Sequence, residues 1–196
     1  LYVGLDPRKE NHPIYNQQAE YYNSHLTMFE TPKTTKFHCE AAEDFNYEDY
    51  EDTFDIIFTS PPYFNVERYS HDDTQSWVRY KDINNWNTQF LQKALDNMLP
   101  TLRSGGKLCV NISDVYSPSA GKKAWSKICD PMNEFLDEYT DMEYKGCIGM
   151  EMAKRPNSGG AGTAKDTKQY TEESLQLAKE TKDKRFCEPV WIWEKK

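Results

Sequence analysis

The segment Ser60-Pro61-Pro62-Tyr63 contains the residue types best suited to chemistry on a substrate. The Ser60 hydroxyl and the Pro61 carbonyl can each accept a hydrogen bond from an N–H group. The two proline rings fix φ and remove backbone donors, which makes the turn stiff. Tyr63 offers an aromatic face, and stacking on such a face is worth roughly 1–3 kcal/mol per base. The segment could hold an amine-bearing ring, although a tyrosine without the preceding triplet would be read as core packing.

Two acidic residues follow predicted strands elsewhere in the chain. Asp6 ends the apolar run at residues 1–5, and Glu40 follows the strand expected at residues 35–39. Ligands of open α/β sheets bind beyond the carboxyl ends of the strands, where loops converge. Asp6 could therefore accept hydrogen bonds from ribose hydroxyls, and Glu40 from an adenine amino group. Each acid taken alone is more simply a helix cap or a solvated loop residue.

The remaining pattern alternates strands with helices. Apolar residues three and four apart predict a helix from Ile83 to about Pro100, and a second helical stretch is expected at Lys123–Tyr139. Two adjacent prolines cannot lie in a central strand, so the strand before Ser60 must end there. This alternation predicts a single α/β domain with a mostly parallel sheet. Strands are expected at residues 1–5, 35–39, 54–58, 107–112, 143–152 and 189–193.

Composition limits the class of protein. A chain of 196 residues is long enough for one domain with a real core. No apolar run approaches the roughly 18 residues of a membrane span, and the first residues do not resemble a secretory signal. The five cysteines form no CxxC pair, and the four histidines form no ligand pattern with them. We expect a cytoplasmic protein with reduced cysteines, no bound metal and no membrane partner.

The charge distribution bears on a nucleic-acid partner. The formal net charge of −8 argues against phosphate binding, which requires clustered lysine and arginine. Residues 1–144 hold 13 basic and 24 acidic side chains, whereas residues 145–196 hold 11 basic and 8 acidic ones. Contacts to a nucleic-acid backbone are therefore expected from the C-terminal part. Ordinary solvated faces without a partner explain the charge equally well.

In this strand context the chain resembles the S-adenosylmethionine-dependent amino-methyltransferases that modify adenine N6 or cytosine N4 in DNA. Their hallmark is an (Asp/Asn/Ser)-Pro-Pro-(Tyr/Phe/Trp) loop after the fourth strand, present here as Ser60-Pro61-Pro62-Tyr63. The serine form, with Thr59 before it, looks most like the cytosine-N4 branch. The turn at 105–108 and the closing segment 188–193 are also similar to later parts of these enzymes.

The resemblance implies a Rossmann-like methyltransferase fold, a mostly parallel sheet with helices on both faces and an antiparallel strand near the C-terminus. It implies S-adenosyl-L-methionine as cofactor and DNA as partner, with base flipping if the DNA is double-stranded. The oligomeric state stays open, with a homodimer as one option. The implied catalytic residues are Ser60, Pro61, Pro62 and Tyr63; the cofactor residues are Asp6, Glu40, Ala41 and Thr59; and the substrate residues are Tyr63, Phe64 and Arg155.

The sequence departs from the family at one point. The glycine-rich loop that follows the first strand in these enzymes is absent, so we expect residues 1–196 to form a single catalytic domain without that strand and loop. Residues 155–185 are either a target-binding insertion or an exposed loop. Two alternatives to a cytosine-N4 enzyme remain: a methyltransferase acting on adenine N6, an RNA base or a protein amide, and a noncatalytic methyltransferase-like binding module.

Overall fold

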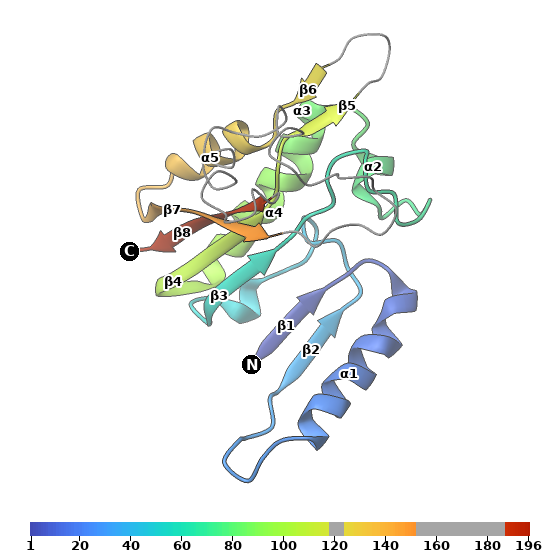
Figure 1. Ribbon diagram of the computed structural model, residues 1–196, viewed down its shortest axis with the longest axis vertical. Coiled ribbons are helices and arrows are strands. Elements are labelled where there is room, and N and C mark those ends of the chain that lie inside the picture. Colours follow the sequence, from blue (N-terminus) through green and yellow to red (C-terminus); the bar gives the residue numbers. More distant parts are fainter. Residues whose placement is uncertain (118–123, 152–186) are drawn as a thin grey trace.

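The protein is described by a computed structural model that covers residues 1–117, 124–151 and 187–196. The strands in these ranges form three sheets, and helices pack around the largest one (Figure 1). Arg155 and the expected insertion at residues 155–185 lie outside the described residues. In the described part, no helix is both long and apolar enough to cross a membrane.

The largest sheet has four strands in the order β3-β4-β8-β7. Strand β3 (Phe54–Thr59) pairs in parallel with β4 (Leu102–Asn111). Strand β8 (Cys187–Lys195) runs antiparallel to both of its neighbours, β4 and β7 (Met142–Glu151). The predicted Rossmann-like α/β class, with an antiparallel strand near the C-terminus, is confirmed. The strand bounds differ from the prediction mainly at two places: β4 begins five residues earlier than predicted, and β8 begins two residues earlier and ends two residues later.

A second, two-stranded parallel sheet is formed by β1 (Tyr2–Leu5) and β2 (Thr35–His38). The helix α1 (His12–Ser24) connects these strands and starts with a proline in its first turn, where the missing N–H costs nothing. The ring of Tyr15 on α1 stacks on Phe37 of β2, with 5.4 Å between the ring centroids. This contact fixes the first turns of α1 beside the end of β1.

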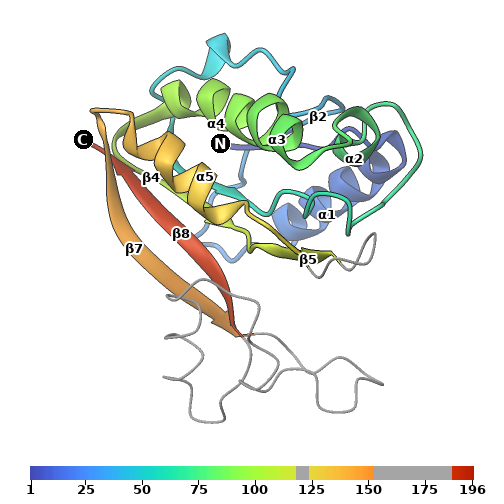
Figure 2. The ribbon, with the colours of Figure 1, turned by 90° about the horizontal axis from the view of Figure 1, so that it is seen from above.

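One continuous helical segment covers a face of the large sheet (Figure 2). It comprises α3 (Ile83–Asn85), a π-helical stretch at Trp86–Gln92, α4 (Lys93–Met98) and a final 3₁₀ turn at Leu99–Thr101. Asp82 caps its start, because the side chain accepts hydrogen bonds from two backbone N–H groups. The prediction of a helix that ends near Pro100 is confirmed. The buried apolar side chains of this segment and the sheet form the core: Trp86, Leu91, Leu95, Leu108, Val110, Trp191 and Trp193.

Two glycines shape the irregular start of β4. Gly105 has φ +78°, a conformation that side chains with a Cβ adopt only with strain. A Cβ on Gly106 would lie 2.8 Å from the carbonyl oxygen of Arg103 and 3.0 Å from that of Phe54. The turn therefore needs glycine at both positions to bring β4 into register with β3.

The second predicted helix begins later than expected. Residues Ala124–Ser126 form β6, which pairs with β5 (Val115–Ser117) as a separate antiparallel hairpin. The helix α5 spans Cys129–Asp137, and Asp114 accepts hydrogen bonds from the backbone N–H groups of Ile128 (2.9 Å) and Cys129 (3.0 Å). The expectation of one helix over Lys123–Tyr139 was wrong in its first turns, because a cap from a distant residue sets the helix start.

Candidate functional site

Three chain segments meet in one cavity of about 450 Å³ at the carboxyl ends of β1 and β3. Six of the residues predicted from the sequence line it: Asp6, Ala41, Thr59, Ser60, Pro61 and Pro62. Side chains of the helical segment over the sheet form another wall, and a short helix, α2 (Ser76–Arg79), contributes its first residue. The sequence gives only the order of these strand ends along the chain. The structure shows that they lie around one cavity.

Asp6 is held in place by three donors. Its carboxylate accepts hydrogen bonds from the backbone N–H of Arg8 (2.8 Å), the side-chain amide of Asn11 (2.8 Å) and the hydroxyl of Tyr15. Partial burial alone would raise the pKa of Asp6, but the hydrogen bonds from Asn11, Tyr15 and Arg8 lower it below its ordinary value. Asp6 is thus an ionised acceptor of fixed orientation on the cavity wall.

Ser60 follows the last residue of β3 and is exposed to the cavity. Its hydroxyl donates to Oδ1 of Asn111, at the end of β4, over 3.3 Å. The side-chain amide of Asn111 donates in turn to the carbonyl of Pro189 in β8, over 3.1 Å. Asn111 is 1% exposed and was not predicted as a site residue, since nothing in its spacing from Ser60 signals the contact. The Ser60 proton is directed toward Asn111, which leaves the oxygen lone pairs for another donor.

Tyr63 and Phe64 do not line the 450 Å³ cavity. The Tyr63 ring is half-buried against the core, and its hydroxyl donates to Oε2 of Glu188 at the start of β8, over 3.4 Å. Burial, together with the carboxylates of Glu188 and Glu67, raises the pKa of Tyr63, so its hydroxyl stays protonated. Phe64 is 6% exposed and packs against Trp86, which places it in the core beneath the loop.

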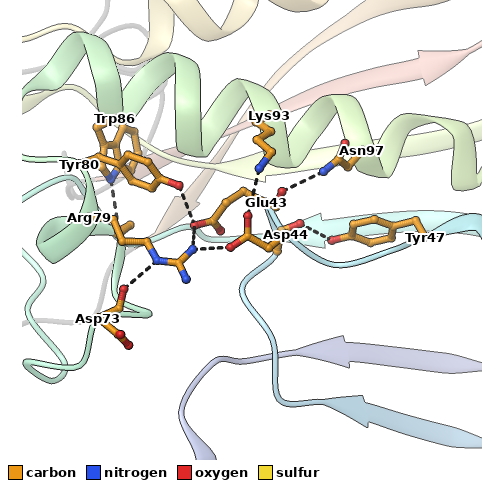
Figure 3. A network of polar contacts seen from close by, with 11 residues as sticks. Glu43, Asp44, Tyr47, Asp73, Arg79, Tyr80, Trp86, Lys93 and Asn97 are labelled. Atoms are coloured by element: carbon orange, nitrogen blue, oxygen red, sulfur yellow. Dashed lines mark hydrogen bonds and ion pairs between the residues drawn. The ribbon is translucent and has the colours of Figure 1, made fainter.

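The acid that faces the cavity in the loop after β2 is Glu43, not Glu40. Glu40 is exposed and does not line the cavity, whereas Glu43 is 1% exposed and does. Figure 3 shows Glu43 among the polar side chains of neighbouring segments. Its Oε1 atom accepts hydrogen bonds from the guanidinium of Arg79 (3.1 Å) and the hydroxyl of Tyr80 (3.3 Å). Only the fold reveals this pairing, because residues 43 and 79 have no spacing that predicts contact.

In the described part of the chain, no group of three or more His, Cys, Asp or Glu side chains is arranged to hold a metal ion. The cysteines in those ranges form no disulfide with one another, and Cys129 and Cys187 are buried. The described residues supply hydrogen-bond acceptors, a stiff proline turn and, beside the cavity, an aromatic ring.

Comparisons with known proteins bear on the family and the fold of this chain. The sequence model of the N6 and N4 DNA methylase family matches residues 54–195. A candidate DNA modification methylase from Thermus thermophilus, solved with S-adenosyl-L-methionine, is similar with a TM-score of 0.50 and 14% identity, over 80% of this chain and 53% of that one. The MccD protein is similar with a TM-score of 0.51 and 13% identity, over 99% of this chain and 79% of that one. A search of curated proteins finds no match.

At these identities the solved structures support the fold, and this chain spans about half the length of the Thermus thermophilus protein. The family match is broader evidence, because it covers more than half of the chain and includes the Ser60–Tyr63 loop, β4 and β8. On that basis the chain belongs to the DNA methylase family of the N6 and N4 type.

Proposed function

We propose that this protein transfers a methyl group from S-adenosyl-L-methionine to the exocyclic amine of a DNA base, and that the base is cytosine with N4 as the acceptor. The observation that carries the proposal is the convergence of Asp6, Ala41 and the Ser60–Pro62 turn on one cavity. The family match supports the coarser activity. The serine form of the loop favours cytosine, through its resemblance to the cytosine-N4 branch.

The cavity fits this cofactor in its volume and in the hydrogen-bonding groups on its wall. Its volume of about 450 Å³ lies within the usual range of roughly 300–1,000 Å³ for small-molecule sites. Asp6 is an oriented acceptor for ribose hydroxyls, and Ala41 and Thr59 line the same cavity. Bound there, S-adenosyl-L-methionine would supply an electrophilic methyl group on its sulfonium. Asp6, Ala41 and Thr59 are the residues that we assign to holding it.

Ser60 and Pro61 prepare the amine for attack. The lone pair of an exocyclic cytosine amine is delocalised into the ring, so the amine is a poor nucleophile. An amine that donates one N–H to the Ser60 oxygen and the other to the Pro61 carbonyl is favoured in a pyramidal form, with its lone pair localised. Asn111 assists, because its Oδ1 atom accepts the hydrogen bond from the Ser60 hydroxyl and leaves the lone pairs of the serine oxygen free to accept from the amine.

Tyr63 supplies a stacking surface for the base. Its ring is fixed at one end by packing against the core and at the other by the hydrogen bond to Glu188. Since Tyr63 is next to Pro62 but outside the cavity lining, the base would approach from the side of Tyr63 while the cofactor occupies the cavity. A base in duplex DNA can reach this position only by leaving its stack. Arg155 remains a proposed contact to the DNA.

Calorimetry and nucleoside analysis test the proposal. Titration with S-adenosyl-L-methionine should give saturable heat, whereas a noncatalytic module would give none. DNA incubated with the protein and the cofactor should then yield N4-methylcytosine after digestion to nucleosides. N6-methyladenine in its place would overturn the cytosine assignment, and binding without any modified nucleoside in DNA would overturn the activity on DNA.

We also propose that the catalytic domain is completed by a further apolar strand between β1 and β3. These two strands are not hydrogen-bonded to each other, and a cavity of about 580 Å³ lies between them. Both arrows point the same way in Figure 1, so an inserted strand could run parallel to both. Ile56 and Phe58 of β3 line this cavity and are 63% and 61% exposed. A strand here would cover them and would carry the glycine-rich loop of the family to the cofactor site.

A further inference from the structure

The backbone of Tyr63 is held by residues that follow it in the chain. Pro61 and Pro62 have no N–H group, so the first backbone donor beyond them is the N–H of Tyr63. This group donates to Oε2 of Glu67 over 3.0 Å. The carbonyl of Tyr63 accepts a hydrogen bond from the N–H of Val66, also over 3.0 Å. Glu67 therefore fixes the end of the proline turn, at the residue whose ring we assign to stacking.

The residue after Tyr63 has a strained backbone conformation. Phe64 has φ +43°, in the left-handed region that residues with a Cβ rarely adopt. A residue keeps such a conformation only where its surroundings hold it. On one side, the buried Phe64 ring packs against Trp86 in the core. On the other side, Glu67 holds the N–H of Tyr63, so removal of this carboxylate would let the turn relax.

Glu67 interacts with two aromatic residues at the site but is not part of the cavity wall. It does not line the 450 Å³ cavity, whereas Tyr69 does. Partial burial raises the pKa of the Tyr69 hydroxyl, and the nearby carboxylate of Glu67 raises it further. The second aromatic residue is Tyr63, on the side from which the base would approach. Glu67 is thus placed to act on the site through its neighbours.

We propose that Glu67 is a positioning residue, which orients the Tyr63 ring for stacking on the target base by accepting the N–H of Tyr63. The inference rests on the proposed function, which assigns the stacking role to Tyr63. Contacts of the ring itself, with the core and with Glu188, fix its far end. The contact with Glu67 fixes the backbone from which the ring projects. A charged acceptor makes this hydrogen bond stronger than a neutral one.

Variants at position 67 test the inference through kcat/KM for DNA. Glu67→Ala leaves the N–H of Tyr63 without its acceptor, so kcat/KM should fall about tenfold, because small displacements of a positioned group are costly. The Kd of S-adenosylhomocysteine should stay within about twofold of the wild-type value, because Glu67 does not line the cavity. Glu67→Gln keeps an oxygen acceptor on a side chain of the same shape, so its kcat/KM should lie within about threefold of the wild type. Glu67→Asp, one methylene shorter, withdraws the acceptor but keeps the charge, and it replaces Glu67→Ala if that variant folds poorly.

Changes at Tyr63 separate positioning from folding. In Tyr63→Phe the ring is kept, so adding Glu67→Ala should again lower kcat/KM about tenfold. In Tyr63→Ala the ring is absent, so adding Glu67→Ala should cause no further loss of kcat/KM. The N–H of residue 63 is present in every background, so Glu67→Ala should lower the urea midpoint equally in each of them. A loss of kcat/KM that persists undiminished in Tyr63→Ala would overturn the inference, because Glu67 would then not act through the ring.

Asp72→Ala is the matched control. Asp72 is an exposed acid in the same loop, and its Oδ2 atom accepts a hydrogen bond from the hydroxyl of Ser70 over 2.6 Å. In the part of the chain that the structure describes, Asp72 makes no hydrogen bond to Tyr63 and does not line the cavity. Asp72→Ala should therefore leave kcat/KM unchanged. A fall equal to that of Glu67→Ala would overturn the inference, because it would assign the effect to disturbance of the loop as a whole.

The same measurements distinguish a failure of this inference from a failure of the proposed function. An unchanged kcat/KM in folded Glu67→Ala, with a lowered urea midpoint, would overturn the inference, because Glu67 would then contribute to stability alone. Methylation of DNA by the wild type would in that case leave the proposed function intact. A wild-type protein that binds no S-adenosylhomocysteine and modifies no DNA would overturn the proposed function and the inference with it.

Discussion

The hydroxyl of Ser60 lies 3.3 Å from Oδ1 of Asn111, a residue 51 positions further along the chain. This contact links the ends of two parallel strands, β3 and β4, at the cavity. Asn111 also donates to Pro189, so one buried amide connects the Ser60–Tyr63 loop to β8 as well. The loop is therefore positioned by three strands of the large sheet and not by its own sequence alone.

A double-mutant cycle tests whether Asn111 acts through Ser60. Ser60→Ala should lower kcat about 100-fold, and Asn111→Ala about tenfold, because the misplaced acceptor no longer localises the lone pair of the amine. In the Ser60→Ala background, Asn111→Ala should cause no further loss of kcat. Full additivity of the two losses would show that Asn111 does not act through Ser60.

Asn133 provides a control for that cycle. Its side chain also bonds to a neighbouring carbonyl, that of Cys129, and accepts from the indole of Trp193 in β8. It has no contact with Ser60 in the described structure. Asn133→Ala should lower stability but leave the kcat of the folded fraction unchanged, which urea titration and steady-state kinetics together would establish.

Tyr63 variants separate stacking from hydrogen bonding. Tyr63→Phe removes only the contact to Glu188, so turnover should fall no more than severalfold. Tyr63→Ala removes the ring and should lower kcat/KM for DNA about 10- to 100-fold, the equivalent of roughly 1–3 kcal/mol of stacking. Similar kcat/KM values for Tyr63→Ala and the wild type would exclude the stacking role.

Pro61→Ala tests the stiffness of the turn. The alanine restores a backbone N–H and frees φ, so the carbonyl at position 61 loses its fixed direction. We expect transfer to be abolished while the melting temperature changes little. Turnover at the wild-type level in a folded Pro61→Ala protein would contradict the assigned role of this carbonyl.

Asp114 should be important for stability without affecting the site. It is 7% exposed, accepts from two backbone N–H groups at the start of α5, and pairs with Lys127 at 2.9 Å. Asp114→Ala should lower the free energy of unfolding by about 2–4 kcal/mol. Asp130 also pairs with Lys127 but is exposed, so Asp130→Ala should cost less than about 0.5 kcal/mol. Urea denaturation measures both.

The lowered pKa of Asp6 predicts that the stability of the protein depends on pH. Its folded pKa lies below the ordinary value of 3.8, through hydrogen bonds that outweigh burial, so its stabilising contribution is present above pH 3.8 and is lost as the pH falls through the folded pKa. Asp6→Asn should therefore be less stable than the wild type at pH 7, and this difference should shrink below pH 3.8. Asp55→Asn, at an exposed ion pair with Arg103, should show little difference at either pH.

The open side of β3 gives a test of the additional strand. In the 196-residue chain Phe58 is 61% exposed, so Phe58→Lys should change the free energy of unfolding by less than about 0.5 kcal/mol. In a longer version of the protein that contains the additional strand, the same substitution should cost about 2 kcal/mol or more, because a buried phenylalanine is replaced by a charge. An equally small cost in both proteins would count against the strand.

Much of the fold follows from local patterns. The strands of the large mixed sheet and of the small parallel sheet, and the helix ending near Pro100, were predicted because apolar periodicity and proline positions depend only on neighbours in the chain. The start of α5 was predicted too early, and the hairpin β5–β6 was missed. The start of α5 depends on its cap by Asp114, and the hairpin depends on the pairing of β5 with β6. Both are contacts between residues that no local sequence pattern connects.

The sequence by itself determined the motif, its place at the end of a strand and the acceptor at Asp6, because residue type and strand order fix these features. The tertiary structure decided which side chains reach the cavity. It placed Glu43 there instead of Glu40, buried Phe64 in the core and set Asn111 behind Ser60. The physical reason is that burial and orientation arise from packing between distant segments, and the spacing of residues along the chain contains no record of those contacts.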